Sequence, residues 1–452
     1  MLESPAYPHV EDNVLALLGD PAAAGLYLGR CQVDTPQPLV RQIWKLVNER
    51  RPNAGAVIDF GCGDARFARA GAYSSYTGFE IDRSRYSEAS IPANAKIINA
   101  CAFSEDIQGF TCCIGNPPYV RNQDLPLGWR QSAAESIERR TGVRISGLAN
   151  AWQYFFLLSL ASTNADGLVA IVVPFEWVSR PSSAALRDFI KAQGWNVSVY
   201  RLSDSTFESV LTTASITIVD KQEKNGRWSY YRQDEAGAFQ KMKSLTGGKR
   251  AVLPYVSGNT KDTHAKRGLS PGTQDYLVLT ESERARCGLR PERDVVRCIT
   301  SLRPTDGDAL AFTDSIFIRD YVNAGRKCWL VRTDKIPSPR LQAYLDSVPN
   351  EARKSSTCSG REVWWRFTMP ALPKALIATG FKKFPKVVIN EAGVVAVGSV
   401  CGIYARSHAA AERAVRLLRG LDYSGRVVPH ANGLLKLEIN QINYLLASEY
   451  DH

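Results

Sequence analysis

The sequence predicts an α/β protein, built from a doubly wound, mostly parallel sheet and a strand-rich second domain. Three observations support this prediction. Short apolar runs alternate with helix-like stretches in the first half of the chain, two turns rich in glycine or proline directly follow apolar runs, and the charge changes near the middle. Repeated alternation of strands and helices is typical of a parallel sheet covered by helices on both faces.

Seven runs in the first half have the length and residue types of strands. Each is short, apolar and bounded by Gly, Pro, Asn or Asp. They are Ala56–Phe60, Tyr76–Phe79, Lys96–Ile98, Thr111–Ile114, Leu168–Val173, Val197–Leu202 and Ala214–Val219. Because only a short connection separates the last two, we expect them to form an antiparallel edge of the sheet.

Helix-like stretches and a polar boundary complete the predicted organisation. Helices are expected at Pro38–Glu49, Trp152–Ser162 and Ser182–Ala192. The polar stretch Lys221–Arg227 indicates a boundary between domains at 1–225 and 226–452. In the second domain we expect four strands and one helix, the helix lying between Ser407 and Gly420. These elements are Cys328–Arg332, Val363–Phe367, Lys386–Ile389, Val394–Tyr404 and the helix Ala409–Leu418.

Composition narrows the class of protein. The 452 residues are 44% hydrophobic and 22% charged, which is typical of a globular chain and excludes disordered and fibrous classes. No apolar run is long enough to span a bilayer, and acidic residues stand where a secretory signal would be basic. The ten cysteines include no C-x2-C pair, so we expect buried thiols, no metal site and a cytoplasmic location.

The positive charge is concentrated in the second half of the chain. Residues 1–220 contain 19 Lys+Arg and 22 Asp+Glu, whereas residues 221–452 contain 37 and 23. The net charges are therefore −3 and +14. This asymmetry favours a module that grips a polyanion attached to a catalytic module, and an ordinary basic solvated surface is the alternative.

A glycine-rich turn follows the first predicted strand. The segment 57–67 runs from an apolar strand through Asp59, Gly61, Cys62 and Gly63 into a helix. Glycines at this position let a ligand approach the backbone, although the third glycine of the dinucleotide fingerprint is missing. Glu80 ends the next strand, 17 residues after Gly63, where a carboxylate can accept hydrogen bonds from both hydroxyls of a ribose.

A polar and aromatic tetrapeptide follows the fourth predicted strand. Asn116, Pro117, Pro118 and Tyr119 bring an amide, a rigid backbone carbonyl and an aromatic ring together at the end of that strand. The Asn116 side-chain oxygen and the Pro117 carbonyl can both accept hydrogen bonds from an exocyclic amine, which makes its nitrogen more nucleophilic. Tyr119 is expected to stack on the ring that carries the amine.

These segments together resemble the class I S-adenosylmethionine-dependent amino methyltransferases, and among them the gamma-class, TaqI-like N6-adenine DNA methyltransferases of restriction-modification systems. The similarity covers about residues 29–220. It implies a Rossmann-like fold, a catalytic role for residues 116–119, and stacking of a flipped target base between Tyr119 and Phe207. The cofactor residues that it implies are Thr35, Asp59, Gly61, Cys62, Gly63, Glu80, Ile81, Ala102 and Phe103.

One position departs from the family pattern. The family usually places an acidic residue before an aromatic one to hold the cofactor's adenine amine, whereas this chain has Ala102 before Phe103. Phe103 can still pack on the adenine. Glu105, Asp106 or a backbone carbonyl is a candidate for the missing acceptor.

The resemblance implies a monomeric enzyme that methylates adenine in double-stranded DNA, with any cognate restriction endonuclease a separate protein. Transfer from the sulfonium would be direct, and the target base would leave the duplex stack. Alternative substrates are cytosine N4, an RNA base, or the glutamine of a release factor, for which the basic second domain has no evident use. A catalytically silent DNA-binding protein is the non-enzymatic alternative.

The second domain resembles the family's DNA-recognition domains only in position, charge and strand content. Three basic pairs are candidate phosphate contacts: Lys382–Lys383, Arg326–Lys327 and Arg353–Lys354. The aromatic cluster Trp364, Trp365 and Phe367 is expected to belong to the core rather than to a base-stacking surface.

Overall fold

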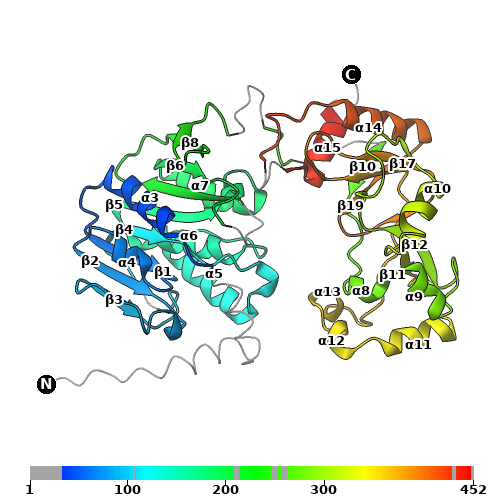
Figure 1. Cartoon of the computed structure of the whole chain (residues 1–452), viewed down its shortest axis with the longest axis horizontal. Coiled ribbons are helices and arrows are strands. Elements are labelled where there is room, and N and C mark those ends of the chain that lie inside the picture. Colours follow the sequence, from blue (N-terminus) through cyan, green and yellow to red (C-terminus); the bar gives the residue numbers. More distant parts are fainter. Residues whose placement is uncertain are drawn as a thin grey trace. The chain divides into compact units, whose positions relative to one another are not determined.

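The chain folds into two compact units, Met1–Gly247 and Gly248–His452. The computed structural model describes residues 33–104, 107–207, 213–245, 252–256, 262–429 and 434–448. Figure 1 labels the helices and strands of both units. Each unit has its own hydrophobic core and is described by itself.

The first unit is built on a nine-stranded sheet with the order β3-β2-β1-β4-β5-β7-β6-β8-β9. All seven strands predicted in this region are present, with shifts of at most one residue at their ends, except that β5 begins five residues before the predicted Leu168. The strands are β1 (Ala56–Phe60), β2 (Ser75–Phe79), β3 (Ala95–Ile98), β4 (Phe110–Gly115), β5 (Thr163–Pro174), β6 (Asn196–Arg201), β7 (Ala214–Asp220), β8 (Trp228–Gln233) and β9 (Phe239–Lys241).

The pairing confirms the predicted doubly wound, mostly parallel sheet. Strands β3, β2, β1, β4 and β5 pair in parallel, and β7 pairs antiparallel with both β5 and β6. The predicted antiparallel pairing of β6 and β7 is thus confirmed. Their predicted position at the edge is wrong, because β8 pairs in parallel with β6 and β9 extends the sheet further.

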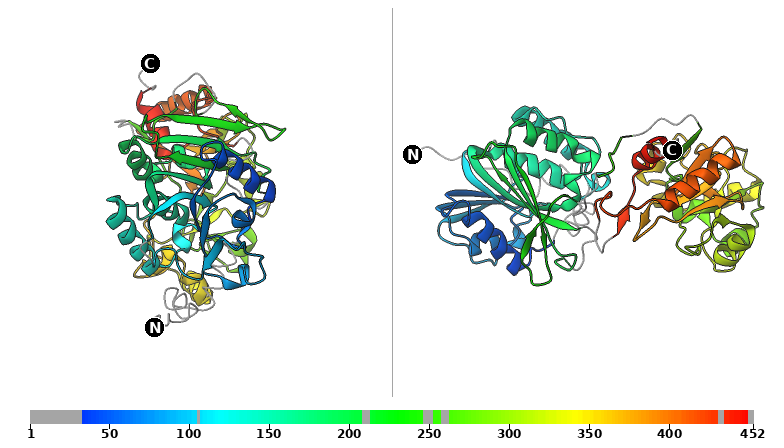
Figure 2. Two further views of the ribbon diagram at one scale, coloured as in Figure 1. Left: turned by 90° about the vertical axis from the view of Figure 1, so that its left-hand side faces the viewer. Right: turned by 90° about the horizontal axis from the view of Figure 1, so that it is seen from above.

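Helices cover both faces of this sheet (Figure 2). On one face, α3 and α4 pack on a core that includes Val57, Ile114 and Ile216, and on the other face α6 packs on β4 and β5. The helices are α3 (Gln37–Asn48), α4 (Arg66–Ala70), α5 (Leu127–Thr141), α6 (Ala151–Ser162) and α7 (Ala184–Ala192). The 3-10 turns are η1 (Arg83–Arg85), η2 (Asn122–Asp124), η3 (Phe175–Val178) and η4 (Pro181–Ser183).

The expected domain boundary after residue 225 falls inside the first unit. The polar stretch Lys221–Arg227 is a tight connection that leads directly from β7 into β8. The Val197 amide donates to the carbonyl of Arg227 (2.8 Å), which starts the parallel pairing of β6 with β8. Polarity indicated a linker here because a turn at the edge of a sheet has the same solvated composition as a boundary between domains.

The second unit contains a five-stranded sheet of order β10-β19-β15-β17-β13, a four-stranded sheet and a two-stranded ribbon, β16-β20. Its strands are β10 (Thr263–Lys266), β11 (Val278–Leu279), β12 (Val295–Ile299), β13 (Ala311–Phe312), β14 (Trp329–Val331), β15 (Ala375–Ala378), β16 (Gly380–Phe381), β17 (Val387–Asn390), β18 (Val395–Ala396), β19 (Val400–Ala405) and β20 (Leu435–Lys436). Its helices are α8 (Gln274–Leu277), α9 (Glu281–Arg286), α10 (Asp314–Phe317), η5 (Ile318–Val322), α11 (Pro339–Ser347), α12 (Asn350–Arg353), α13 (Ser356–Ser359), α14 (His408–Gly420) and α15 (Ile439–Ser448). Among the described residues of this unit, strands outnumber helices, but most of the strands are short and the helices contain more residues.

Two predicted strands of this unit differ from the structure. Residues 394–404 form two strands, β18 and β19, because Gly398 has a φ of 63° and turns the chain between them. Residues 363–367 form a turn in which the Arg366 amide donates to the Val363 carbonyl (2.9 Å). Trp365 is nonetheless buried in the core, with Trp364 packed against it, so the predicted core role of these aromatic residues is confirmed.

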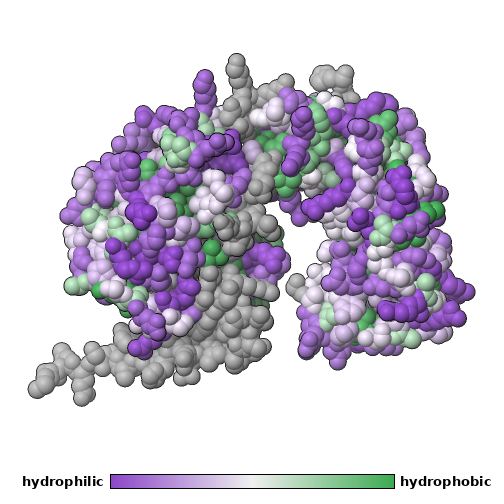
Figure 3. All heavy atoms as spheres, viewed as in Figure 1, coloured by the Kyte–Doolittle hydropathy of each residue, from purple (hydrophilic) through white to green (hydrophobic). Residues whose placement is uncertain are grey.

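Figure 3 shows hydrophilic residues over most of the described surface visible in that view, with hydrophobic residues scattered among them. Among the described residues, no helix combines the length and apolar character needed to cross a bilayer.

Candidate active site

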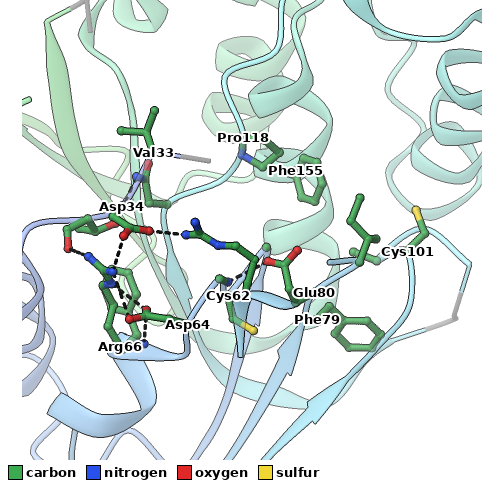
Figure 4. A pocket seen from close by; sticks show the side chains of 18 of the residues that line it. Val33, Asp34, Cys62, Asp64, Arg66, Phe79, Glu80, Cys101, Pro118 and Phe155 are labelled. Carbon is green, nitrogen blue, oxygen red and sulfur yellow. Dashed lines mark hydrogen bonds and ion pairs between the residues drawn. The ribbon is translucent and has the colours of Figure 1, made fainter. Parts of the chain in front are cut away.

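A pocket lies where β1, β2 and β4 end at the same edge of the sheet (Figure 4). In an open parallel sheet, ligands bind at the carboxyl ends of the strands. Nine of the predicted site residues line this pocket: Thr35, Gly61, Cys62, Gly63, Glu80, Ile81, Ala102, Asn116 and Pro118. The topology therefore brings together segments that are spread over more than 80 positions of the sequence.

The glycine-rich turn forms the floor of the pocket. Gly61 and Gly63 have φ values of 78° and 56°, a left-handed conformation that glycine adopts without steric cost. The amides of Gly61 and Cys62 both donate to the carbonyl of Phe79, at 2.8 and 3.0 Å. These bonds fix the turn to the end of β2, which is the strand that carries Glu80.

Glu80 points into the pocket and is held by backbone amides (Figure 4). Its Oε2 accepts from the Gly63 amide (2.9 Å) and its Oε1 from the Asp82 amide (3.0 Å). Burial raises the pKa of this carboxyl, while the two amides oppose the rise. A fixed carboxylate with free lone pairs on both oxygens is suited to accept from a pair of neighbouring hydroxyls.

The Asn116 amide is oriented by Thr35, which comes from a distant segment. Asn116 Nδ2 donates to the Thr35 hydroxyl oxygen (3.1 Å). Asn116 Oδ1 is buried and has no hydrogen-bond partner among the described residues. Because the nitrogen is already engaged, the oxygen is presented as an acceptor. A buried unpaired acceptor costs about 1 to 3 kcal/mol, so this oxygen indicates a ligand that donates a hydrogen bond.

Asp59 lies beneath the pocket and does not line it. Its side chain is fully buried, and its Oδ2 accepts from the Tyr76 hydroxyl (2.6 Å). Burial is the main cause that raises its pKa to about 7, the Tyr76 bond opposes the rise, and the charge of Glu80 adds to it. A Cβ atom on Gly115 would lie 2.2 Å from Asp59 Oδ1, so the strand that leads to Asn116 can approach this carboxyl only with glycine at position 115.

A network of ion pairs borders the pocket and was not predicted from the sequence (Figure 4). Asp34 pairs with both Arg66 (2.8 Å) and Arg85. These two ion pairs join the segment before α3 to α4 and to η1. Arg66 and Arg69 also pair with Asp64. Burial raises the pKa of the Asp64 carboxyl, but the two arginines lower it by more, so the net shift is downward. The alternating charges of residues 64–69 were the available signal, but a solvated helix has the same pattern.

Apolar and aromatic side chains form the remaining wall, where Ala102 stands. Trp129 and Phe155 line the pocket, and neither was predicted. Phe103 does not line it but packs edge-on against both rings, at 5.4 and 5.1 Å between centroids. Glu105 and Asp106, the candidates for the missing acceptor, lie outside the described residues.

Pro117, Tyr119 and Phe207 do not line this pocket either. Pro117 is buried beside Asn116. The Tyr119 hydroxyl is buried without a partner among the described residues, and burial raises its pKa well above the usual value. Phe207 is half-buried and packs on the core beneath α3 and β6. The roles of Tyr119 and Phe207 in base stacking stay predictions.

The described residues contain no group of three or more His, Cys, Asp or Glu side chains that could hold a metal ion.

Two segments of the chain match known protein families. Residues 74–206 match the Eco57I restriction-modification methylase family, and residues 259–418 match the C-terminal domain of the Type II methyltransferase M.Eco57I. The first match contains Glu80 and residues 116–119 of the pocket region. The second lies within the basic unit.

The Type II methyltransferase M.XamI of Xanthomonas campestris pv. amaranthicola is 22% identical over 463 residues, covering 91% of this chain and 84% of that protein. A methyltransferase subunit of a type I restriction-modification system from Streptococcus thermophilus is 19% identical, with a TM-score of 0.39, and covers 47% of this chain and 50% of its own. A class I S-adenosylmethionine-dependent methyltransferase from Listeria monocytogenes, described as putative, is 15% identical, with a TM-score of 0.34. The match covers 49% of this chain and 75% of that protein. Together with the relative M.XamI, the two family matches support a methyltransferase of the restriction-modification type.

Proposed function

We propose that this protein is a sequence-specific DNA methyltransferase that modifies the exocyclic N6 amine of adenine. The restriction-modification family supports DNA as the substrate. The net charge of the second unit supports it as well, because residues 248–452 contain 31 Lys+Arg and 20 Asp+Glu.

One observation carries the proposal: Asn116 Oδ1 is a buried acceptor without a partner at the edge of the pocket, and its amide is oriented by Thr35. An amine is the donor that such an oxygen fits. Accepting a hydrogen bond from the amine pulls the nitrogen lone pair out of conjugation with the ring and favours its attack on a methyl group. The Pro117 carbonyl is proposed as the second acceptor.

S-adenosylmethionine is the methyl donor, and when bound it supplies an electrophilic methyl group on a sulfonium. The lining of the pocket fits this molecule. Glu80 is proposed to accept from its ribose hydroxyls, and the apolar wall of Ile81, Trp129 and Phe155 to pack on its adenine. Asp34 and Arg66 provide charges of both signs for its ammonium and carboxylate.

A base inside a duplex cannot reach Asn116, so we propose that the target adenine flips out of the stack. Tyr119 and Phe207 are the residues proposed to stack on the flipped base. Aromatic stacking is worth roughly 1 to 3 kcal/mol per base, which is comparable with the cost of extrusion.

The proposal is tested by incubating the enzyme with labelled S-adenosylmethionine and plasmid DNA, followed by modified-base sequencing. We expect N6-methyladenine within one short sequence motif. Equal amounts of RNA serve as the competing substrate. Label in RNA alone, or N4-methylcytosine in the plasmid, would contradict the proposal.

The Asn116→Ala variant separates chemistry from binding. Loss of one polarising group in an active site typically costs about 3 to 4 kcal/mol of transition-state stabilisation, so transfer should fall below about one hundredth of wild type. Binding of cofactor and DNA, measured by calorimetry and gel shift, should change only a few-fold. Residual transfer above about one tenth would remove Asn116 from the catalytic role.

A further inference from the structure

The turn between β16 and β17 in the second unit carries an exposed aromatic ring beside two exposed lysines. Phe384 exposes 56% of its surface, and Lys382 and Lys383 precede it directly. Among the described residues, neither lysine is joined to another side chain by an ion pair or hydrogen bond. A large aromatic side chain left in water beside two free ammonium groups indicates a surface that contacts an anionic partner with flat apolar faces.

The frame beneath this turn is held firmly. Phe381, at its start, is buried and packs edge-on against Tyr423, with 5.1 Å between ring centroids. At its end, Lys386 Nζ donates to the carbonyls of Leu302 (3.3 Å), Arg303 (3.0 Å) and Thr305. The exposed tip is therefore presented by a fixed base, and little ordering entropy remains to oppose binding.

Three of the four side chains in the other two basic pairs that the sequence marked as phosphate contacts are engaged by the unit itself. Arg353 donates to three backbone carbonyls at the end of α11. Arg326 Nε donates to the Asp320 carbonyl (3.0 Å), and Lys327 Nζ donates to the Asp275 carbonyl. These contacts give Arg353, Arg326 and Lys327 structural roles. The pair Lys382–Lys383 is the one in this comparison whose charges are not used within the described unit.

We propose that the turn Lys382–Phe384 is a DNA-inserting wedge, in which both lysines contact phosphates and the Phe384 ring enters between two adjacent base pairs. The inference rests on the proposed function, because it takes duplex DNA as the partner. Proteins that widen or bend a duplex often insert an apolar side chain into a base step. The two lysines would hold the DNA backbone next to the wedge, while contact with the ring offsets the cost of unstacking.

The test compares full-length variants on a pool of 40-base-pair duplexes in which 5-iodouracil replaces thymine. The Phe384→Ala variant should bind roughly ten-fold more weakly than wild type, with an unchanged salt slope. Leu372→Ala is the matched control, because Leu372 exposes a similar 58% of an apolar side chain in the same unit. It should bind as wild type does.

Photo-cross-linking locates the contact. On irradiation, the wild-type peptide that contains Phe384 should be cross-linked to DNA, and this cross-link should be lost in Phe384→Ala. The double variant Lys382→Gln/Lys383→Gln should retain the cross-link. Its negative slope of log K against log salt should become shallower, by roughly 0.9 for each lysine removed. Binding of Phe384→Ala equal to that of Leu372→Ala, with cross-links elsewhere, would overturn the proposal.

Two further measurements distinguish a failure of the wedge from a failure of the proposed function. If Phe384→Ala unfolds at a lower temperature than wild type, the Phe384→Trp variant is used in its place. DNA should quench the fluorescence of the added tryptophan, and an unchanged emission would overturn the wedge. Methylation of plasmid DNA by wild type together with a failed wedge test contradicts this inference alone. An absence of methyl transfer to any DNA contradicts the proposed function.

Discussion

The hydrogen bond between Asn116 and Thr35 determines which atom of the amide faces the substrate. The two residues are 81 positions apart, and Thr35 precedes α3 whereas Asn116 follows β4. An amide can present either a donor or an acceptor, and only its neighbours settle the choice. With Nδ2 bound to the Thr35 hydroxyl, Oδ1 is left as the acceptor. Thr35 is thus a positioning residue for the proposed chemistry.

Replacing Thr35 with Val should lower kcat by about ten- to a hundredfold, because a misoriented amide no longer holds the amine in a productive geometry. Thr35→Ser, which keeps the hydroxyl, should retain most of the activity. In an Asn116→Ala background, Thr35→Val should have no further effect on kcat. Single-turnover methylation of plasmid DNA measures all four proteins, and additive effects of the two substitutions would contradict the positioning role.

The buried carboxyl of Asp59 makes stability depend on pH. Its pKa is about 7 in the folded protein and lies near 4 in the unfolded chain, so the folded state holds the proton more tightly. The contribution to stability is complete below about pH 4 and is lost as pH rises towards 7. Asp59→Asn removes this loss, so the variant should gain stability relative to wild type across that range, by about 1.4 kcal/mol for each unit of pKa difference.

Urea unfolding of both proteins at several pH values between 4 and 8 measures this difference. Tyr76→Phe is the companion variant, because it removes the hydrogen bond that lowers the Asp59 pKa. The higher pKa of Asp59 in this variant should extend the loss of stability to higher pH and so make it larger, at the same slope. A constant difference between wild type and Asp59→Asn at every pH would show that Asp59 titrates at an ordinary value.

At the scale of elements, a buried lysine joins α6 to β7. Lys221 follows β7 directly and exposes only 4% of its surface. Its Nζ donates to the carbonyls of Leu160 (3.0 Å) and Thr163 (2.7 Å), which are carbonyls that the end of α6 cannot satisfy internally. Burial lowers the pKa of Lys221 to about 8, because it disfavours the charged ammonium. The two carbonyl acceptors stabilise the ammonium and so oppose this desolvation cost.

Lys221→Met keeps the aliphatic stem but removes the buried hydrogen bonds to both carbonyls. The first unit should lose about 2 kcal/mol of stability, which lowers its unfolding temperature by roughly 4 to 8 °C. Lys224→Met, at an exposed position three residues later, is the control and should change little. Calorimetry of the full chain distinguishes the two variants, and equal midpoints would show that the buried bonds contribute nothing net.

At the scale of the whole molecule, the two units differ in charge. Residues 1–247 contain 25 Lys+Arg and 25 Asp+Glu, whereas residues 248–452 carry a net charge of +11. A fragment of residues 248–452 should therefore bind duplex DNA with a steep salt dependence, and a fragment of residues 1–247 should bind weakly. Gel-shift titrations between 50 and 200 mM salt test this, with circular dichroism to verify folding.

The position of the cut is part of this prediction. A fragment that begins near Arg227 would remove β8 and β9 from the sheet of the first unit and carry them unpaired into the second. Such exposed strands favour aggregation. Equal binding by the two fragments cut after Gly247 would count against a separate DNA-binding unit.

The sequence by itself determined seven of the nine strands described in the first unit, the turn at Gly61 and Gly63, and the tetrapeptide that begins at Asn116. These are local signals: a strand end, a left-handed turn and two prolines depend on neighbouring residues, so spacing was enough to place them on one sheet edge. It also determined the charge asymmetry, which needs no coordinates.

Only the tertiary structure decided the rest. Thr35 orients Asn116, Asp34 joins Arg66 and Arg85, and Asp59 lies below the pocket that it was expected to line. Strands β8 and β9 extend the first sheet, and residues 363–367 form a turn instead of a strand. Except in the turn at 363–367, the deciding contact joins segments far apart in sequence, and its free energy outweighs a local preference worth less than about 1 kcal/mol per residue.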